Sequence, residues 1–375
     1  GEMVGISGAT WRMLEPLTDM GFRSPSGIAP NREPDVRAAL ASETNLRVQS
    51  TDVYFAGKEL ALLARHMLIA DELGETALVE TYRNSLQADL QPWLEGTNGD
   101  PLVYDETWGG VVIRAGLTNP GISFGQGYYN DHHFHYGYLI YACAALATLD
   151  PTWDQTWGEH ARALIRDIAN PAGSDPYFPI TRNKDWYTGH SWASGLFASD
   201  DSRNQESTSE AVNAYYAVYL YGLAVGDDDL RDLGRVMLAL ELRSAWTYWQ
   251  ITSADDVYPQ PFAENKVVGI LWDSKVEYNT FFGTNIEFIH GIQYLPFTPI
   301  AETLLRPEWM TEAYPVVSLA LNSPALGEGW RGFIFMAHAT FAPEDAWTEV
   351  QSLRAYDNGN SRTNTLYWVA TRPRP

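Results

Sequence analysis

Apolar positions recur at steps of three and four residues through most of the chain, which is the spacing of an amphipathic helix. The pattern runs over residues 51–74, stops at a glycine, and resumes at once over residues 75–96. Two helical segments joined by so short a break pack against each other in antiparallel directions. The sequence therefore predicts a helical hairpin over residues 51–96.

The same arrangement appears twice more. Residues 134–170 contain an Asp-Pro turn between two helical patterns, and residues 207–250 contain a run of aspartates between two others. Proline cannot continue a helix, so the first break is well defined. Weaker pairs follow at 284–322 and 330–355, and helices are expected to dominate from residue 51 to the end.

The two helices of each strong pair differ in character. The first is apolar nearly all round, as in ALLARHMLIA and LIYACAALATL, whereas the second carries more charge, as in EHARALIRDIA. A helix that is apolar on every side is buried, and one with a charged face is partly solvated. We therefore expect an all-α dominated fold, an α/α barrel (toroid) with an inner and an outer layer of helices.

Long segments without helical periodicity connect these pairs, at 97–130, 170–206 and 251–283. Loops of that length in a folded domain usually carry function. Residues 1–50 contain Gly, Ser and Pro patches and only a short helical stretch, DVRAALAS. We predict an irregular or strand-bearing lead-in over residues 1–50, followed by the helical domain at 51–375.

Composition excludes several classes of protein. The formal net charge is -22, and lysine is confined to positions 58, 184, 266 and 275. Nucleic-acid binding needs clustered basic residues, so it is not expected. No apolar run reaches the length of a membrane span. Cys143 is the only cysteine and lies in an apolar run, which excludes an intrachain disulfide and a multi-cysteine zinc site. The first residues, GEMVGISG, have no signal-peptide pattern.

Two junctions between a long loop and a helix carry carboxyl groups. The first is GYYNDHHFHYGY, residues 127–138, which holds Asp131 beside three histidines. The second holds Glu206 and Glu210, which share one face if both lie on the helix. A structural alternative exists at each junction: Asp131 as a helix N-cap, and Ser207 with Glu210 as a capping box.

The three histidines, at 132, 133 and 135, raise the question of a metal site. Their spacing does not converge on one ion as an i, i+4 pair does, and no HExxH motif accompanies them. We expect no metal. One or two of these histidines are expected to contact substrate or orient Asp131.

Aromatic residues are frequent in the same loops: Trp108, Tyr128, Tyr129, Trp186, Tyr187, Trp192, Trp272, Phe281 and Phe282. Aromatic rings in a carboxylate-rich cleft suit a neutral sugar chain, which stacks on rings and donates hydrogen bonds to acids. Hydrolysis of a glycosidic bond needs one protonated acid and one carboxylate. The pattern therefore favours a polysaccharide hydrolase.

Several blocks resemble glycoside hydrolase family 81, the endo-β-1,3-glucanases: YYNDHHFHYGY, DWYTGHSWASGLF, NQESTSEAVNAYYA, NKVVGILWDSKVEY, NIEFIHGIQYLPFTP and YDNGNSRTNTLYWVATRP. They run in order from about residue 50 to the C-terminus. The resemblance implies an (α/α)6 catalytic barrel, inverting hydrolysis of laminarin-type β-1,3-glucan, and no cofactor. Family members usually carry a β-sandwich domain ahead of the barrel, so either such a domain was removed or this chain does without it.

Carried over by position, the resemblance implies that Asp131 is the general acid and Glu210 the general base, with Glu206 as helper or rival. It also implies a set of substrate-binding residues: Trp108, Tyr129, His133, His135, Tyr136, His190, Trp192, Asn204, Glu287 and His290. We expect a monomer that acts on extracellular or cell-wall glucan, secreted or at the cell surface. Two alternatives stay open: a noncatalytic glucan-binding module, and a polysaccharide lyase.

Overall fold

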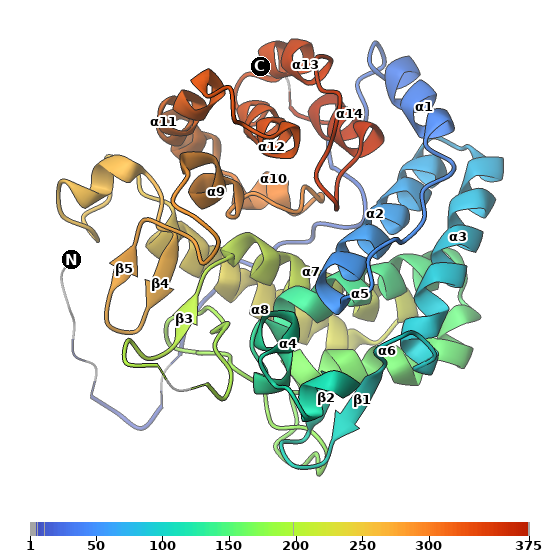
Figure 1. The fold of residues 1–375 in the computed structure, drawn as a ribbon, viewed down its shortest axis with the longest axis vertical. Helices are drawn as coiled ribbons and strands as arrows, with labels where there is room; N and C mark the ends of the chain where they lie inside the picture. The colour runs from blue at the N-terminus through green and yellow to red at the C-terminus, as the bar shows by residue number, and fades with distance from the viewer. Residues whose placement is uncertain (1–4, 6, 11, 198, 374–375) are drawn as a thin grey trace.

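The structure is a computed structural model that describes residues 5, 7–10, 12–197 and 199–373. Helices dominate it, and the few strands are short (Figure 1). The longer helices are α1 (Glu33–Ser42), α2 (Val53–Glu72), α3 (Thr76–Glu95), α5 (His132–Leu149), α6 (Trp153–Ala169), α7 (Thr208–Val225) and α8 (Asp228–Ser244). The later and shorter ones are α9 (Ile286–Gly291), α10 (Ala301–Leu304), α11 (Pro307–Val317), α12 (Glu328–His338), α13 (Pro343–Val350) and α14 (Arg362–Ala370), and α4 (Ile122–Gly125) precedes α5.

The three strong helical hairpins predicted from the sequence are confirmed as α2–α3, α5–α6 and α7–α8. Their ends follow the expected local chemistry. The Asp52 side chain accepts the backbone N–H groups of Tyr54 and Phe55 at the start of α2, which satisfies two otherwise unpaired donors. Gly96 and Gly226 end α3 and α7 in the left-handed conformation, which costs glycine little.

The predicted inner helices form the core. α5 packs between α2 and α7, and its residues 132–147 are all buried. The helices approach closely at Gly137, where an added Cβ would lie 2.7 Å from the Cα of Ala214. A side chain at this position would push α5 and α7 apart, so glycine is required by packing.

The C-terminal helices are shorter and were predicted less well. α12 and α13 correspond to the weak pair predicted at 330–355, but α14 was not predicted as a separate helix. α14 contacts α1, α2, α12 and α13, and α12 contacts α9. The hydroxyls of Ser207 and Ser209, at the start of α7, donate to the Ile292 carbonyl just after α9. The C-terminal helices thus connect α7 back to α2 (Figure 1).

In the described part of residues 1–50, the chain is irregular except for α1, and no strand occurs there. α1 packs on α14. Arg32 is buried, and its guanidinium donates to the carbonyls of Val369 (3.1 Å) and Pro343 (3.2 Å). Residue 50 therefore marks no break in packing between the lead-in and the helices.

The long loops contain short strands that the sequence did not predict. β1 (Leu102–Asp105) and β2 (Gly110–Ile113) form a hairpin in the first loop. β3 (Asn204–Gln205) pairs with β4 (Ile270–Trp272), which pairs with β5 (Val276–Glu277), all antiparallel. The pairing of β3 with β4 places Asn204 opposite Trp272. Two loops far apart in sequence therefore meet beside the start of α7.

Candidate active site

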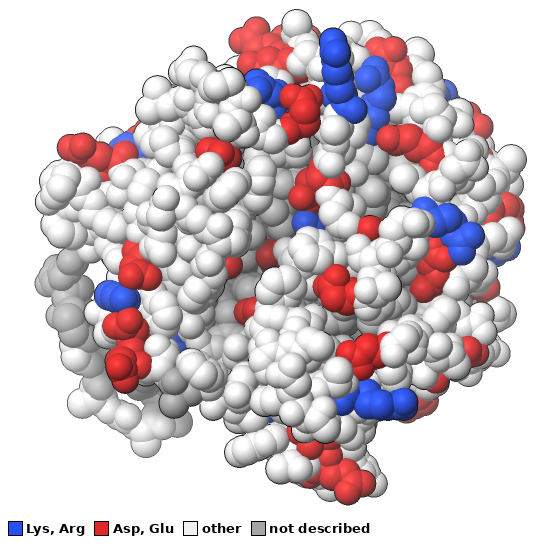
Figure 2. All heavy atoms as spheres, in the orientation of Figure 1, with Lys and Arg blue, Asp and Glu red and all other residues white. Residues whose placement is uncertain are grey.

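A cavity of about 690 Å³ opens where these loops meet the helix starts. Figure 2 shows the same face hollowed near its middle, with acidic side chains around the hollow. Asp131, Glu206 and Glu210 all line the cavity, so the structure brings the three predicted acids together. The other lining residues are Tyr54, Phe55, Lys58, Phe124, Asn130, Phe134, His135, Ala193, Ser194, Phe197, Ser199, Asn204, Trp272, Phe281, Phe282, Ile292, Leu295, Trp330 and Asp357.

Asp131 immediately precedes α5 in a left-handed conformation (φ 59°, ψ 15°), and its side chain makes no capping hydrogen bond. The helix-cap interpretation of this aspartate is therefore wrong. Its backbone N–H donates to the Ala193 carbonyl at 2.9 Å, which fixes the residue against the opposite loop. A left-handed non-glycine residue costs about 1–3 kcal/mol and is typical of functional sites. Here it directs a carboxyl group into the cavity.

Burial raises the pKa of the Asp131 carboxyl well above its ordinary value, and the negative charges of Glu206 and Glu210 raise it further. A carboxyl group in such surroundings keeps its proton at a pH where a solvated aspartate loses it. Asp131 can therefore donate a proton.

Glu210 lies in the first turn of α7 and is 3% exposed. Its Oε1 accepts hydrogen bonds from the hydroxyls of Tyr54 (2.8 Å) and Tyr138 (2.7 Å). Ser207 makes no capping hydrogen bond, and its hydroxyl donates to the Ile292 carbonyl at 3.0 Å. The capping box is therefore not formed. With Oε1 occupied twice, Oε2 is the oxygen left for other partners.

Burial raises the pKa of Glu210, while the positive charge of Lys58 and the hydrogen bonds from Tyr138 and Tyr54 lower it in turn. These donors stabilise the charged form of the carboxyl group. Glu210 is thus a buried carboxylate whose negative charge has several specific partners.

Glu206 lies in the link between β3 and α7. Its Oε1 accepts the Phe281 backbone N–H at 2.7 Å, and its own carbonyl accepts from the Gln293 side chain at 2.6 Å. Burial raises the pKa of Glu206 to about 7, the Phe281 hydrogen bond lowers it, and the charge of Glu210 raises it. This carboxyl group is therefore partly protonated near neutral pH.

Aromatic rings form much of the cavity wall. Trp272, Phe281 and Phe282, which the sequence had suggested as sugar platforms, all line it. Phe281 and Phe282 are 62% and 50% exposed, which is unusual for phenylalanine. The Phe282 and Trp330 rings are stacked with centroids 6.0 Å apart. Such rings offer faces on which a sugar can stack.

Two of the ten predicted binding residues, His135 and Asn204, line the cavity. His135 lies one turn after Asp131, and its Nδ1 is buried with no hydrogen-bond partner among the described residues. Burial holds the pKa of His135 well below its ordinary value, so the ring is neutral. An unpaired nitrogen of this kind is available to a hydroxyl of a ligand.

Four further predicted residues lie near the first junction but do not line the cavity. Trp108 is exposed at the turn between β1 and β2. Tyr129 is buried and donates to Asp105 at 3.0 Å. His133 pairs with the Gln205 side chain at 3.3 Å, and Tyr136 donates to the Val111 carbonyl at 2.6 Å. The last three side chains are already satisfied inside the protein.

The other four are also placed away from the cavity lining. His190 is buried and pairs with the Ser244 hydroxyl at 2.8 Å. Trp192 is buried beneath the Arg203 guanidinium, which lies 4.7 Å from its ring centre. Glu287 accepts from Asn285, and His290 lies between the hydroxyls of Tyr278 and Tyr294. Lying in a characteristic block did not place these side chains at the cavity.

The sequence reasoning missed Tyr54, Lys58 and Asp357 at the cavity and Tyr138 beneath it. Tyr54 and Lys58 lie on α2, in a stretch that reads as an ordinary apolar helix, and Asp357 lies near the C-terminus. Only Tyr138 left a local signal, since it lies within the aromatic block around Asp131.

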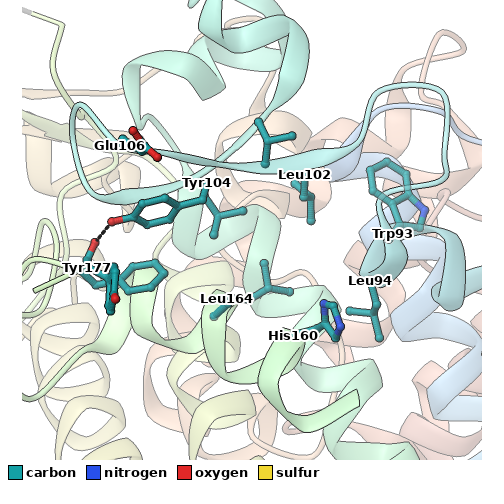
Figure 3. A pocket seen from close by; sticks show the side chains of 12 residues that line it. Trp93, Leu94, Leu102, Tyr104, Glu106, His160, Leu164 and Tyr177 are labelled. Atoms are coloured by element: carbon teal, nitrogen blue, oxygen red, sulfur yellow. Dashed lines mark hydrogen bonds between the residues drawn. The ribbon is translucent and has the colours of Figure 1, made fainter. Parts of the chain in front are cut away.

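A second cavity, of about 390 Å³, lies between the β1–β2 hairpin and helices α3 and α6 (Figure 3). Trp93, Leu164 and Tyr104 line it, and the Tyr104 hydroxyl donates to the Tyr177 carbonyl. Glu106 is the only carboxyl group among its lining residues. This cavity therefore lacks the acid pair that the first one offers.

Within the described ranges, no group of three or more His, Cys, Asp or Glu side chains is placed to hold a metal ion. Over the same residues, no helix combines the length and apolar character needed to cross a membrane.

The helical domain thus brings three carboxyl groups together in an aromatic cavity, and paired carboxyl groups are what hydrolysis of a glycosidic bond requires. The comparison with protein families identifies the family. The family model described as "Glycosyl hydrolase family 81 C-terminal domain" matches residues 27–369, so the chain belongs to this family. The resemblance stated from the sequence is thereby confirmed.

Two relatives with names of their own are similar to this chain. The chain is 36% identical over 99% of its length to a "Glucan endo-1,3-beta-D-glucosidase" from Glycine max, covering 57% of that protein. It is 37% identical over 85% of its length to a "Primary septum glucan endo-1,3-beta-D-glucosidase" from Schizosaccharomyces pombe, covering 32% of it. The chain thus spans a third to somewhat over half of these relatives.

A solved structure is also similar. It is a mutant form of a glycoside hydrolase family 81 protein from Clostridium thermocellum, with a TM-score of 0.80 and 27% identity. The match covers 94% of this chain and 49% of that one. The helical fold described above is therefore that of the family.

Proposed function

We propose that this chain is the catalytic part of an inverting endo-β-1,3-glucanase, with its helices arranged as an (α/α)6 barrel. The observation that carries the proposal is the meeting of Asp131, Glu206 and Glu210 in one aromatic cavity. The named relatives support the choice of β-1,3-glucan. The return of the C-terminal helices to α2 supports the closed barrel.

Asp131 is the general acid in this proposal. Its raised pKa keeps the carboxyl group protonated until it transfers the proton to the glycosidic oxygen of the leaving sugar. Asn substitution removes this proton but keeps the shape of the side chain. Asp131→Asn is expected to lose nearly all activity on laminarin while remaining folded, and full activity in this variant would remove the assignment.

Glu210 is the general base, and Glu206 assists it. Two tyrosine hydroxyls and Lys58 favour the charged form of Glu210, whereas Glu206, with a pKa of about 7, is partly protonated near neutral pH. The free Oε2 of Glu210 would take the proton of the attacking water. Inversion requires the acid and base carboxyls to stand roughly 6.5–9.5 Å apart, with that water between them.

The stereochemistry of the product tests the mechanism directly. Proton NMR of a laminari-oligosaccharide digest should show the α anomer first, because inversion turns a β bond into an α hemiacetal. A β anomer would indicate retention and would refute the assignment of a base. The sizes of the first products test endo cutting, since an exo enzyme would release one size only.

The cavity argues against a polysaccharide lyase. Lys58 is the only lysine or arginine among its described lining residues, and its ammonium group already pairs with Asp357 at 2.7 Å. A uronate substrate would bring another negative charge to four carboxyl groups. Release of an unsaturated product that absorbs at ~235 nm would favour the lyase over the hydrolase. Absence of any reducing-sugar release from curdlan would favour a noncatalytic glucan-binding module.

The setting follows from the substrate. β-1,3-Glucan polymers lie in cell walls or outside cells, so we propose that the enzyme acts there, as a secreted or surface protein and as a monomer. The proposed steps use carboxyl groups and water and require no cofactor.

A further inference from the structure

A single lysine, Lys58, lines the cavity among its described residues, and its side chain is buried. Lys58 of α2 is 5% exposed, and its Nζ donates to Oδ2 of Asp357, which is 23% exposed. Removing an ammonium group from water costs several kcal/mol even when it is paired, and such pairs are often no more stabilising than apolar residues. The ion pair therefore calls for a role other than stability.

The pair is held rigidly between α2 and the loop before α14. An added Cβ at Gly359 would lie 3.0 Å from the Lys58 Cε, so the loop runs directly against the lysine stem. The Asn358 side chain donates to Glu59 of α2 at 2.6 Å. The Gly359 backbone N–H donates to Oδ2 of Asp357 at 3.2 Å. These contacts fix the ammonium group in one place.

Lys58 is linked to the proposed base through Tyr54. It lies one helical turn after Tyr54, and its Nζ is 5.6 Å from the centre of that ring. The Tyr54 hydroxyl donates to Oε1 of Glu210. The charge of Lys58 is also the strongest of the influences that lower the pKa of Glu210 against its burial.

The groups around Glu210 come from four parts of the chain. α2 supplies Lys58 and Tyr54, and the start of α5 supplies Asp131, His135 and Tyr138. The segment before α7 supplies Glu206, and the loop before α14 supplies Asp357. The carboxylates oppose ionisation of Glu210, the tyrosines favour it as donors, and His135 is neutral. Lys58 is thus the only positive charge described in this shell.

We infer that Lys58, held in place by Asp357, is a positioning residue that keeps Glu210 ionised as the base and so separates its role from that of Glu206. The inference rests on the proposed function, because it assumes that Glu210 receives the proton of the attacking water. No proton passes through Lys58 itself. Its charge acts on Glu210, and its ammonium group lies beside the ring of Tyr54, which donates to Glu210.

Neutralising each partner in turn provides the test. Lys58→Met keeps the length of the side chain and removes its charge, so the acid limb of the kcat/KM profile on laminari-oligosaccharides should move to higher pH. Each unit of movement lowers activity about tenfold on that limb. Asp357→Asn leaves the ammonium group without its counter-charge, so the limb should stay or move to lower pH. Loss of a merely structural contact would move both profiles in the same direction, and that result would overturn the inference.

The double variant Lys58→Met with Asp357→Asn separates charge from pairing. If the lysine charge matters, the double variant keeps an acid limb at higher pH than wild type. If it recovers the wild-type profile, the pair matters only as a pair and the inference fails. Arg83→Met, which removes a surface charge paired with Glu80 on α3, is the matched control and should leave the limb in place.

A direct titration separates failure of this inference from failure of the proposed function. Carboxyl 13C NMR of the full chain reports the ionisation of Glu210, with its signal assigned by its absence in Glu210→Gln. The midpoint should rise in Lys58→Met and not in Asp357→Asn, whatever the substrate of the enzyme. An unchanged midpoint in Lys58→Met would overturn the inference even in an active enzyme. A wild-type chain inactive on β-1,3-glucan would instead refute the proposed function.

Discussion

Glu206 is expected to destabilise the folded protein above neutral pH, and its replacement by glutamine should remove that cost. Its pKa is about 7 in the folded chain against an ordinary value of 4.5. At roughly 1.4 kcal/mol per pKa unit, this difference corresponds to about 3 kcal/mol. Between these two pH values the folded state binds the proton and the unfolded state does not, so stability falls as pH rises. The loss is complete above about pH 7 and absent below about pH 4.5.

Glutamine suits this experiment because its side-chain oxygen can still accept the Phe281 N–H group. Urea denaturation of Glu206→Gln and wild type at pH 4 and pH 8 should give a gain in the free energy of unfolding that is about 3 kcal/mol larger at pH 8. Glu308→Gln, at a side chain 64% exposed, is the control and should show no such difference. An equal effect of Glu206→Gln at both pH values would refute the claim that burial holds this proton.

Three further perturbations follow from the packing and hydrogen bonds. Tyr138→Phe removes one donor from Glu210 without altering a cavity-lining residue; a hydrogen bond to a charged group is worth about 1.5–3 kcal/mol, so the acid limb of kcat/KM should rise by about 1–2 pH units. Trp272→Ala removes a ring from the cavity lining, so initial rates should show a higher KM for laminarin. The kcat for a short oligosaccharide should change less. Gly137→Ala places a Cβ 2.7 Å from the Ala214 Cα and should lower the free energy of unfolding by about 1–3 kcal/mol in urea titration.

The helices that the sequence predicted best are those with strong periodicity. α5 and α7 are apolar on every side and flanked by turn residues, so both their positions and their burial follow from the local pattern. α14 was missed because its sequence, RTNTLYWVA, has polar residues that are buried by contacts with α1, α2, α12 and α13. The strands β3 and β4 were missed because their pairing depends on two loops meeting in space.

The candidate site was predicted at the level of its acids. Asp131, Glu206 and Glu210 could be found because each stands at the start of a helix after a long loop, and because family resemblance singled them out. The same reasoning failed to distinguish His135, which lines the cavity, from His133, which does not. Side chains two residues apart on a helix point in directions that differ by about 200°. The sequence does not show which of these directions faces the cavity.

The three catalytic candidates share one physical condition and differ in how it is modified. Burial raises the pKa of Asp131, Glu206 and Glu210 alike. Asp131 has no hydrogen-bond donor to its carboxyl group among the described residues, so its neutral form is favoured. Glu206 has a single backbone donor, while Glu210 has two tyrosines and faces Lys58. The number of donors therefore orders the three candidates from proton donor to proton acceptor. A substitution that alters this number should shift a limb of the pH profile of kcat/KM rather than abolish activity.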